Sequence, residues 1–356
     1  MRRNRLIGLV LTALIVVGIS LAGCRVQERG PGGAQTALEV KRTEFMMDTV
    51  VTITAYGEAA PAAVEEALAE MARIADLMSA EDPGSEVGRL NAAAGQQPVV
   101  LSADTYELLA LAQHYAELTD GAFDVTVRPL VELWGIGKKN EYVPDKARIA
   151  KAQALVNWRD LVLDPDTRTA YLKRPGMGVD LGGAAKGYAA DRARQILAER
   201  GVESALIDAG GNIWALGRHP EGKPWRIGIK NPRPDHGGSV LAIVTSEDDT
   251  LVTSGDYERY FIKGGVRYHH IFNPRTGEPA RASMAVTIIA KNSAQADILS
   301  TAVFVLGPDK GLALVEGLKD VGCVLVTPNE EIIMTPSAKQ KVEIVREEGV
   351  ASDTRR

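Results

Sequence analysis

A glycine-rich segment contains one of the two sets of residues best suited to chemistry in this chain. Residues 179–191 read VDLGGAAKGYAAD and place three glycines around Lys186. Glycine inside a regular element costs roughly 0.5–1 kcal/mol relative to alanine, so such a cluster indicates backbone that must approach something closely. A ligand, a metal and another strand are the three candidates, and this segment alone does not choose among them.

The second set lies in an apolar stretch near the C-terminus, SAQADILSTAVFVLG at 293–307. Asp297 and Thr301 are four residues apart and therefore project from one face of a helix, with Ser300 beside them. Their oxygens suit a hard cation such as Mg²⁺, which protein oxygens, waters and substrate phosphates commonly hold together. The alternative is an aspartate favoured by the helix dipole and a threonine packed into the core.

Two adjacent histidines add a group that titrates near neutral pH. His269 and His270 fall in a predicted strand, so one can face a site while the other meets solvent or the core. The sequence has no Gly-x-Gly-x-x-Gly or Gly-Lys-Ser/Thr run, and no His-x-x-x-His or Cys-x-x-Cys pattern. Dinucleotide-binding, P-loop and zinc sites are therefore disfavoured.

The N-terminal residues predict export and lipid attachment. Residues 1–24 carry three arginines, an apolar run and the ending LAGC, which is typical of a bacterial lipoprotein signal with Cys24 as the lipidated residue. A plain transmembrane anchor is the alternative. Residues 25–42 are polar and glycine-rich and predict a flexible tether, and residues 346–356 predict a charged, frayed tail. We expect a lipid-anchored protein at the cell membrane, facing the periplasm or the outer side of the cytoplasmic membrane.

Residues 43–345 are expected to form the folded domain. Helical spacing predicts helices over 62–79 and 102–121, after Lys186, and over 293–307. Strands and hairpins are predicted at 48–57, 161–173, 204–217, 225–232, 239–248, 250–255, 258–272, 283–292 and 322–335. Because the strands are consecutive in the second half, the predicted fold class is α+β with a largely antiparallel sheet flanked by helices.

Charge and cysteine content exclude some classes of function. The formal net charge is −5 and the chain has no basic block beyond the signal, so nucleic acid is not an expected partner. Cys323 lies in the apolar run VGCVLV and is expected to be a small buried hydrophobe. With Cys24 lipidated, the mature chain has no cysteine pair for a disulfide.

Nine ordered segments together resemble the ApbE family of FAD:protein FMN transferases, flavin transferases long described as thiamine biosynthesis lipoproteins. They are MDTVVTITAYG, SAEDPGSEVGRLNAAAG, GAFDVTVRPLVELWGIG, VDLGGAAKGYAAD, ALIDAGGNIWALG, WRIGIKNPR, TSGDYERYF, HHIFNPRTGEP and AQADILSTAVFVLG. The resemblance covers roughly 43–345 and implies an ApbE-like architecture related to the T-fold. It also implies an enzyme that binds FAD, cleaves its pyrophosphate with Mg²⁺, and transfers FMN to a threonine hydroxyl of a target flavoprotein, releasing AMP.

The resemblance further implies roles for individual residues. Metal ligands are expected from the backbone around Gly183 and Ala184 and from the side chains of Asp297, Ser300 and Thr301. Contacts with FAD are expected from Met47, Ala122, Phe123, Asp124, Asp180, Lys186 and Ile271, although Phe123 could equally belong to the core. Asp297 and His270 are the expected catalytic residues, with His270 as the base near the threonine or, alternatively, as a ligand-orienting residue.

The chain departs from the family pattern at Asn231 and Asn273, where the family usually has aspartate. Both changes remove a negative charge and keep a hydrogen-bonding carbonyl, so neither position is expected to do acid or base chemistry.

Two alternative functions use the same residues. With water as acceptor, the chain would be a metal-dependent FAD pyrophosphatase that gives FMN and AMP. Without catalysis, it would be a lipid-anchored FAD-binding protein, although the metal ligands Asp297 and Thr301 argue against pure storage. Transfer and hydrolysis cannot be separated from the sequence, because the acceptor belongs to another molecule.

Overall fold

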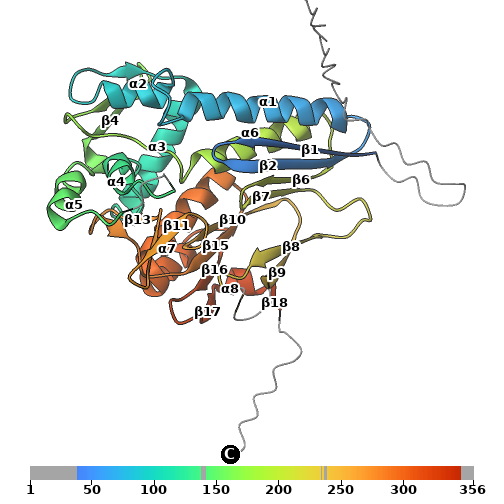
Figure 1. Cartoon of the computed structure of the whole chain (residues 1–356). Coiled ribbons are helices and arrows are strands. Elements are labelled where there is room, and N and C mark those ends of the chain that lie inside the picture. The colour runs from blue at the N-terminus through green and yellow to red at the C-terminus, as the bar shows by residue number, and fades with distance from the viewer. Residues whose placement is uncertain (1–37, 138–141, 234, 236–238, 346–356) are drawn as a thin grey trace, which may run out of the picture. The chain divides into compact units, whose positions relative to one another are not determined.

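The computed structural model describes residues 38–137, 142–233, 235 and 239–345 (Figure 1). The predicted signal, Cys24 and the charged tail lie outside these residues. Strand β1 (Glu39–Met46) pairs along its whole length with β2 (Thr49–Tyr56). The prediction of a tether over 25–42 is therefore wrong for residues 39–42. β1 is an edge strand with mostly exposed, polar side chains, so it carries no alternating apolar pattern.

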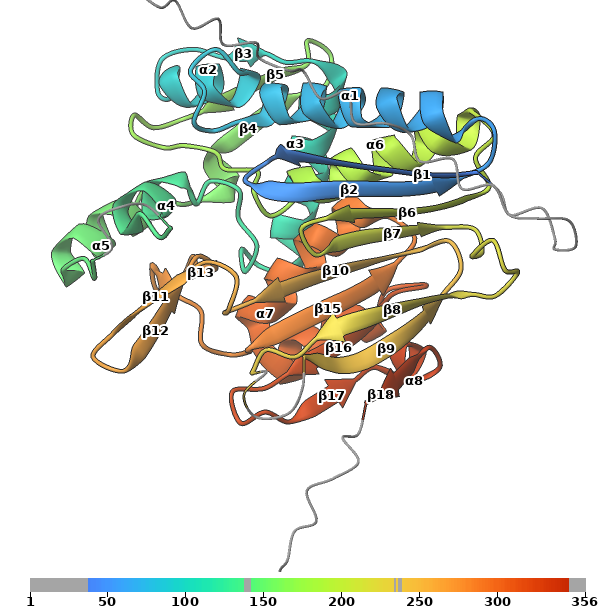
Figure 2. The same ribbon diagram turned by 45° about the vertical axis from the view of Figure 1, so that its right-hand side comes forward.

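An eight-stranded sheet forms the centre of the fold, in the order β1-β2-β6-β7-β10-β15-β16-β17 (Figure 2). All of its neighbouring strands are antiparallel, which confirms the predicted α+β class. Besides β2, the inner strands are β6 (Ser204–Ala209), β7 (Asn212–Leu216), β10 (Asp249–Gly255), β15 (Ala285–Ala290) and β16 (Gly322–Val326), and β17 (Ile332–Met334) closes the far edge. Cys323 in β16 is fully buried, as predicted.

Three long helices cover one face of this sheet: α1 (Ala60–Met78), α6 (Ala185–Glu199) and α7 (Ser293–Glu316) (Figure 2). α1 buries one apolar side because its hydrophobic residues recur at helical spacing. α7 is long and apolar enough to cross a membrane, yet it packs in the core against α6, β10 and β15. It continues beyond the predicted end at 307 through a kink at Gly307 and Pro308.

The other face of the sheet is covered by a smaller antiparallel sheet of β8 (Trp225–Lys230), β9 (Val240–Ser246) and β18 (Val342–Ile344). Ile227, Val244, Leu251 and Ile289 share the second apolar cluster, between the two sheets. The remaining elements are α2 (Glu86–Ala92), β3 (Val99–Val100), α3 (Ala103–Leu118), α4 (Arg128–Trp134), α5 (Lys146–Gln153), η1 (Trp158–Asp160), β4 (Leu161–Asp164), β5 (Thr169–Leu172), β11 (Tyr260–Lys263), β12 (Val266–His269), β13 (Phe272–Asn273), β14 (Glu278–Pro279) and α8 (Pro336–Lys339). The predicted hairpins at 161–173 and 322–335 are confirmed.

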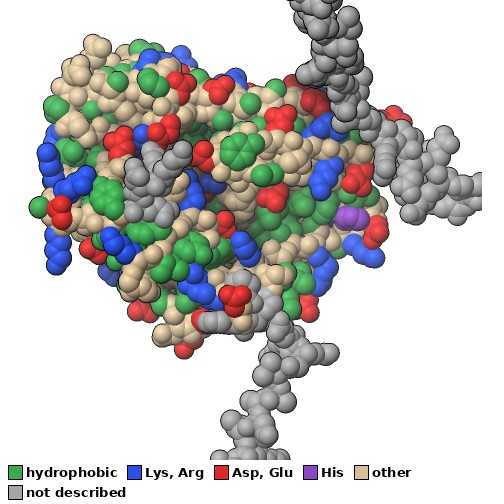
Figure 3. Space-filling model, viewed as in Figure 1, with side chains coloured by type: hydrophobic (Ala, Val, Ile, Leu, Met, Phe, Trp, Pro, Cys, Tyr) green, Lys and Arg blue, Asp and Glu red, His purple; other side chains and the backbone are tan. Residues whose placement is uncertain are grey.

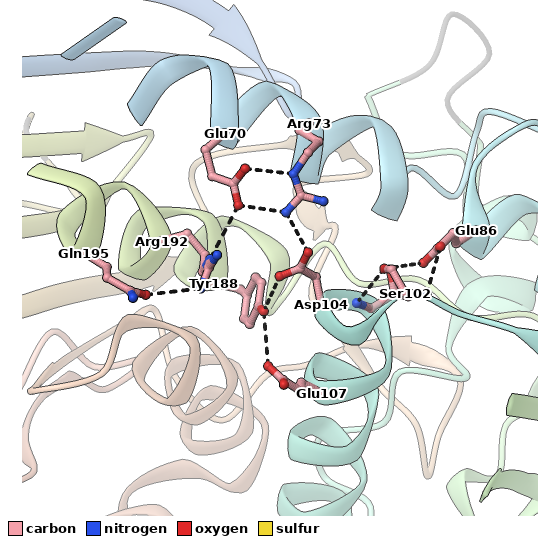
Figure 4. Close-up of polar contacts among 10 residues, drawn as sticks. Glu70, Arg73, Glu86, Ser102, Asp104, Glu107, Tyr188, Arg192 and Gln195 are labelled. Carbon is pink, nitrogen blue, oxygen red and sulfur yellow. Dashed lines mark hydrogen bonds and ion pairs between the residues drawn. The ribbon is translucent and has the colours of Figure 1, made fainter. Parts of the chain in front are cut away.

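A polar network joins helices α1, α3 and α6 (Figure 4). Arg73 of α1 donates to Asp104 of α3 at 2.6 Å, and the hydroxyl of Tyr188 in α6 donates to the same carboxylate at 2.8 Å. Glu70 accepts from Arg73 at 2.8 Å and from Arg192 at 3.5 Å. Burial raises the pKa of Tyr188, and its bond to Asp104 raises it further. Because Tyr188 lies in the first turns of α6, this network fixes the start of that helix.

Candidate active site at the start of helix α6

The start of α6 lies directly against α7, and a glycine makes this contact possible. A Cβ at Gly187 would come within 2.2 Å of the carbonyl oxygen of Ser293. One turn later, Asp191 accepts the backbone N–H groups of Ser293 at 2.8 Å and Ala294 at 2.9 Å, and the indole N–H of Trp214 at 2.7 Å. Burial raises the pKa of Asp191, although these donors favour its ionised form. Gly187 is therefore explained by close contact with a second helix, whereas the sequence analysis named a ligand, a metal or another strand.

This contact places Asp297 of α7 at the first turn of α6. Its Oδ2 atom accepts the backbone N–H of Gly187 at 3.0 Å and lies 3.9 Å from Nζ of Lys186. The same ammonium donates to the carbonyl oxygen of Gly182 at 2.9 Å. The positive end of α6 and the lysine thus compensate a carboxylate that is only 4% exposed. Among the described residues, none donates to Oδ1 of Asp297, which leaves that atom available to a ligand.

Gly183 lies between an aromatic ring and a hydroxyl group. A Cβ at this position would be 3.3 Å from Cε2 of Phe123 and 3.3 Å from Oγ1 of Thr301. Oγ1 of Thr301 lies 3.4 Å from Oγ of Ser254, which projects from β10. Gly183 thus provides the close approach of backbone expected of the glycine-rich segment, beside two of the residues predicted for the site.

Ser300 differs from its neighbour Thr301 in how its hydroxyl is used. Its Oγ atom donates to the carbonyl oxygen of Asp297 at 2.8 Å and shares a hydrogen bond of 2.8 Å with Ser254. Ser300 is fully buried, so this hydroxyl joins α7 to the sheet. Its predicted role as a metal ligand gains no support from these contacts and stays a prediction.

The oxygens around Asp297 fit a hard cation better than a soft one. One carboxylate, the hydroxyl of Thr301 and the backbone carbonyls near Gly183 and Ala184 are the donors that Mg²⁺ accepts. Within the described ranges, no group of three or more His, Cys, Asp or Glu residues could hold a metal. An ion bound here would need further oxygens from water and from substrate phosphates, which is the usual situation for Mg²⁺.

Asp180 precedes the glycine-rich turn and is held by residues that the sequence did not single out. Its Oδ1 atom accepts the N–H of Gly182 at 2.9 Å, and its Oδ2 atom lies 3.6 Å from Nη1 of Arg128. The amide of Asn91 pairs with the peptide groups of Val179, donating at 2.9 Å and accepting at 2.6 Å. Asn91 and Arg128 therefore position the backbone and the carboxylate that lead into α6.

Asp124 is engaged inside its own loop. Oδ1 accepts the N–H and the hydroxyl of Thr126 at 2.8 and 2.7 Å, and Oδ2 accepts the N–H of Trp158 at 2.9 Å. Burial raises the pKa of Asp124, and these donors oppose the shift. Ala122 and Phe123 are buried beside it. The contacts give Asp124 a structural role, and FAD binding by these three residues stays a prediction.

Met47 and the histidine segment lie at one end of the sheet. Met47 and Asp48 form the turn between β1 and β2 with φ of 50° and 56°. The carboxylate of Asp48 is 3.9 Å from Nη1 of Arg259, whose carbonyl oxygen accepts the N–H of His270 at 3.1 Å. Ile271 is buried next to this histidine. Met47 and Ile271 thus belong to two segments that are linked through Asp48 and Arg259. Their contact with FAD remains a prediction.

The two histidines face different surroundings, but β12 ends at His269, so the prediction that both lie in a strand is wrong for His270. His269 is 2% exposed; its Nδ1 atom accepts the N–H of Ile271 at 3.3 Å, and Nε2 lies 2.8 Å from the carbonyl oxygen of Ala280. Since Nδ1 accepts, Nε2 must carry the proton and donate. Burial lowers the pKa of His269 to about 4. This residue is therefore a neutral structural histidine.

His270 is partly exposed and has one ring nitrogen without a protein partner in the described part of the chain. Its Nδ1 atom lies 3.3 Å from the carbonyl oxygen of Arg259, so Nδ1 carries the proton and Nε2 keeps a free lone pair. Burial lowers the pKa of His270, and the charges of Arg259 and Lys186 lower it further. A neutral imidazole with a free Nε2 is therefore present within electrostatic range of Lys186, and its lowered pKa corrects the expectation of a group that titrates near neutral pH.

Protonation of His269 is expected to destabilise the fold in acid. The unfolded chain binds a proton at a pKa near 6.5, whereas the folded protein binds it near 4, so stability should fall as pH decreases from about 6.5 to about 4. One such group changes the free energy of unfolding by at most about 1.4 kcal/mol per pH unit. Denaturant unfolding across this range should show a shallower slope for His269→Gln than for the unmodified protein. Identical slopes would contradict this reading of His269.

The surface is hollowed near the centre of the face in Figure 3, and basic, acidic and hydrophobic side chains border the depression. A separate cavity of about 480 Å³ lies beside α5 and is lined by Gln153, Asn157, Asp160, Arg174 and Pro274 among others. Asp160 and Arg174 pair with each other there at 2.9 Å. None of the residues around Asp297 lines this cavity, so we do not assign it to the candidate site.

Asn231 and Asn273, the two departures from aspartate, have the same local function. The Oδ1 atom of Asn231 accepts the N–H of Arg233 at 2.9 Å, and that of Asn273 accepts the N–H of Arg275 at 2.9 Å. Such a turn needs a carbonyl oxygen and no charge.

Comparison with known proteins adds independent evidence. Residues 47–325 match the model of the ApbE family. An FAD:protein FMN transferase of Klebsiella pneumoniae is 39% identical over 264 residues, covering 74% of this chain and 81% of that protein. An FAD:protein FMN transferase of Treponema pallidum is 35% identical over 334 residues, covering 88% and 91%.

Solved structures agree with this result. The crystal structure of the ApbE protein of Thermotoga maritima superposes with a TM-score of 0.79 at 36% identity and covers 85% of this chain and 99% of that one. The flavin transferase ApbE of Vibrio cholerae gives a TM-score of 0.78 at 30% identity, covering 86% and 99%. On sequence and fold, this chain belongs to the ApbE family.

Proposed function

We propose that this protein is an FAD:protein FMN transferase, which cleaves FAD in a Mg²⁺-dependent reaction and transfers FMN to a threonine of a target flavoprotein. Family membership supports the reaction, since similar proteins carry this name. The observation that carries the proposal within the site is Asp297, a nearly buried carboxylate that is bonded to Gly187 and lies one helical turn before Thr301, whose hydroxyl faces Gly183. Such a donor set suits a cation that also binds phosphates.

The reaction breaks the phosphoanhydride bond of FAD and forms a phosphoester bond to the threonine. The threonine oxygen attacks the phosphorus on the flavin side of the pyrophosphate, the bond to AMP breaks, and AMP leaves with the bridging oxygen. Held by Asp297 and Thr301, Mg²⁺ would neutralise charge on the phosphates and align them. The hydroxyl proton must leave during attack, and the free Nε2 atom of His270 is the base that we propose for it.

The remaining residues hold FAD in this proposal. Lys186 reaches over the start of α6 with an ammonium that already contacts Gly182, and it would move to a phosphate oxygen. Phe123 lies against the turn at Gly183 and would offer its ring to the nucleotide. Asp180 is oriented by Gly182 and Arg128 at the edge of the same turn.

One assay separates the proposed function from its two alternatives. The purified protein is incubated with FAD, Mg²⁺ and a domain that carries an acceptor threonine, and the products are followed by mass spectrometry and chromatography. Transfer predicts an acceptor heavier by one FMN, with AMP released in equal amount. Free FMN with an unmodified acceptor would indicate a pyrophosphatase, and intact FAD would indicate a binding protein.

We also propose that lipid on Cys24 anchors the protein to the membrane, outside the cytoplasm. The LAGC ending at residues 21–24 supports this assignment. Cys24→Ser is expected to leave an uncleaved or soluble protein with unchanged FMN transfer, because the lipid determines location only. Membrane fractionation, lipid labelling and the transfer assay check this. A Cys24→Ser protein that is still cleaved, lipidated and membrane-bound would contradict the assignment.

A further inference from the structure

Asn212, at the start of β7, is a buried amide for which the fold provides no partner. It is 1% exposed, and its Nδ2 atom is buried without a hydrogen-bond partner among the described residues. It pairs across the sheet with Val252, which pairs with Ile288, and both are apolar and buried. A buried polar group left without a hydrogen-bond partner destabilises a fold, so a function for this amide is expected.

The contacts of α7 locate Asp297 over this row of the sheet. Thr250 of β10 donates to Ser293 at the start of α7 at 3.0 Å, and Ser254 of the same strand is 2.8 Å from Ser300. Val252 lies between Thr250 and Ser254 in β10, and its side chain points to the same face of the sheet as theirs. Asp297 lies between Ser293 and Ser300 in α7. The register therefore puts Asp297 above Val252, the direct neighbour of Asn212.

The contacts of α6 also place the carboxylate of Asp297 near Asn212. Asp191 of α6 binds the side chain of Trp214 in β7, and Arg194 lies over that indole ring at 5.1 Å. Gly187 is one turn before Asp191 and Asn212 is two residues before Trp214, so both lie towards the glycine-rich end of α6. Gly187 is also the residue that donates to Asp297. The carboxylate of Asp297 is thus directed from α7 towards the part of α6 that lies over Asn212.

We propose that Asn212 is a positioning residue for the cation site: its Nδ2 atom donates to the carboxylate of Asp297 when that carboxylate turns to bind Mg²⁺. The inference rests on the cation site of the proposed function. In the ligand-free arrangement, Lys186 and the N–H of Gly187 compensate Asp297. A bound cation would compete with Lys186 and Gly187 for this carboxylate, and the amide of Asn212 would then supply a second donor. Carboxylates that bind metals are commonly held by such hydrogen bonds.

A pair of matched variants distinguishes a positioning amide from a structural one. Asn212→Leu removes an amide that has no partner, whereas Asn91→Leu removes one that makes two bonds to Val179. The Tm of the ligand-free protein should therefore be unchanged or raised by Asn212→Leu and lowered by Asn91→Leu. Mn²⁺ serves as the probe of the cation site, followed by electron paramagnetic resonance with and without FAD. Asn212→Leu should weaken Mn²⁺ binding roughly 10- to 100-fold.

Asn212→Ala is the second variant, because leucine is bulkier than asparagine and could disturb the packing. It should show the same loss of Mn²⁺ affinity, while FAD binding in the presence of chelator remains as in the unmodified protein. Unchanged Mn²⁺ affinity in both variants would overturn the role of Asn212, and so would a fall in Tm as large as that of Asn91→Leu with normal Mn²⁺ binding. If the unmodified protein itself fails to bind Mn²⁺ with FAD present, the cation site of the proposed function fails, and this inference with it.

Discussion

Asp297→Asn is expected to lower FMN transfer by about 100-fold or more while the protein stays folded. The change removes the only carboxylate of the proposed cation site, and loss of one group that stabilises transition-state charge typically costs roughly 10²–10³ in rate. Asparagine keeps an oxygen that accepts the N–H of Gly187, which is 3.0 Å from the carboxylate, so the start of α6 remains capped. Transfer is measured by the mass of the acceptor at limiting Mg²⁺, with circular dichroism as the check on folding.

A control for this variant is Asp208→Asn, at an exposed aspartate of β6 that accepts the N–H of Gly211 at 3.3 Å. It makes the same chemical change on another element and should leave transfer unaffected. Undiminished transfer by Asp297→Asn at limiting Mg²⁺ would remove this residue from the cation site.

Gly187→Ala is expected to destabilise the fold by about 1–3 kcal/mol or more and to abolish transfer. The new Cβ would lie 2.2 Å from the carbonyl oxygen and 2.5 Å from the carbonyl carbon of Ser293, both backbone atoms that cannot rotate away. The start of α6 would have to move from α7, and Asp297 would lose the N–H to which it is bonded. Urea unfolding and the transfer assay measure the two effects.

Gly228→Ala in β8 is the matched control, because a Cβ there would make only ordinary contacts, at 3.5 Å or more, with Val240. It should be neutral within a few tenths of a kcal/mol or slightly stabilising. If Gly187→Ala were equally neutral, the close contact of α6 and α7 would not be what the glycine provides.

Much of the fold follows from local patterns. The alternation in 48–57 and 204–217 gave β2, β6 and β7, and the apolar spacing in 62–79 gave α1, because each pattern reports the buried face of its own element. Strand β1 could not be found in this way, since its exposed side chains carry no such pattern and its pairing with β2 is what makes it a strand. The end of α7 was placed too early because Gly307 and Pro308 look like a terminus, whereas the chain resumes the helix after a kink.

The candidate site was predictable only in part. Asp297, Thr301, Gly183 and Lys186 were indicated by resemblance, and the structure brings them together. The residues that position the site come from distant parts of the chain. Asn91, for example, hydrogen-bonds to Val179, which is 88 residues away in the sequence. No local pattern marks such a partner.

The buried amide of Asn212 was missed for a similar reason. It belongs to the quoted segment ALIDAGGNIWALG, but only the register of β7 against β10 and the helices above shows where it lies. Likewise, the alternation of a strand predicted opposite faces for His269 and His270. The resemblance indicated His270, and only the partners of the ring nitrogens show that His270 is the freer imidazole.

The most direct test of the central claim uses FAD with a radioactive phosphorus on its flavin side. The protein is incubated with this FAD, Mg²⁺ and an acceptor domain, and the acceptor is then denatured to remove flavin that is not covalently bound. We predict that the label stays on the denatured acceptor, that unlabelled AMP appears in equal amount, and that changing the acceptor threonine to alanine or chelating the metal abolishes both. Label found only in free FMN or in intact FAD, with none on the acceptor, would contradict FMN transfer.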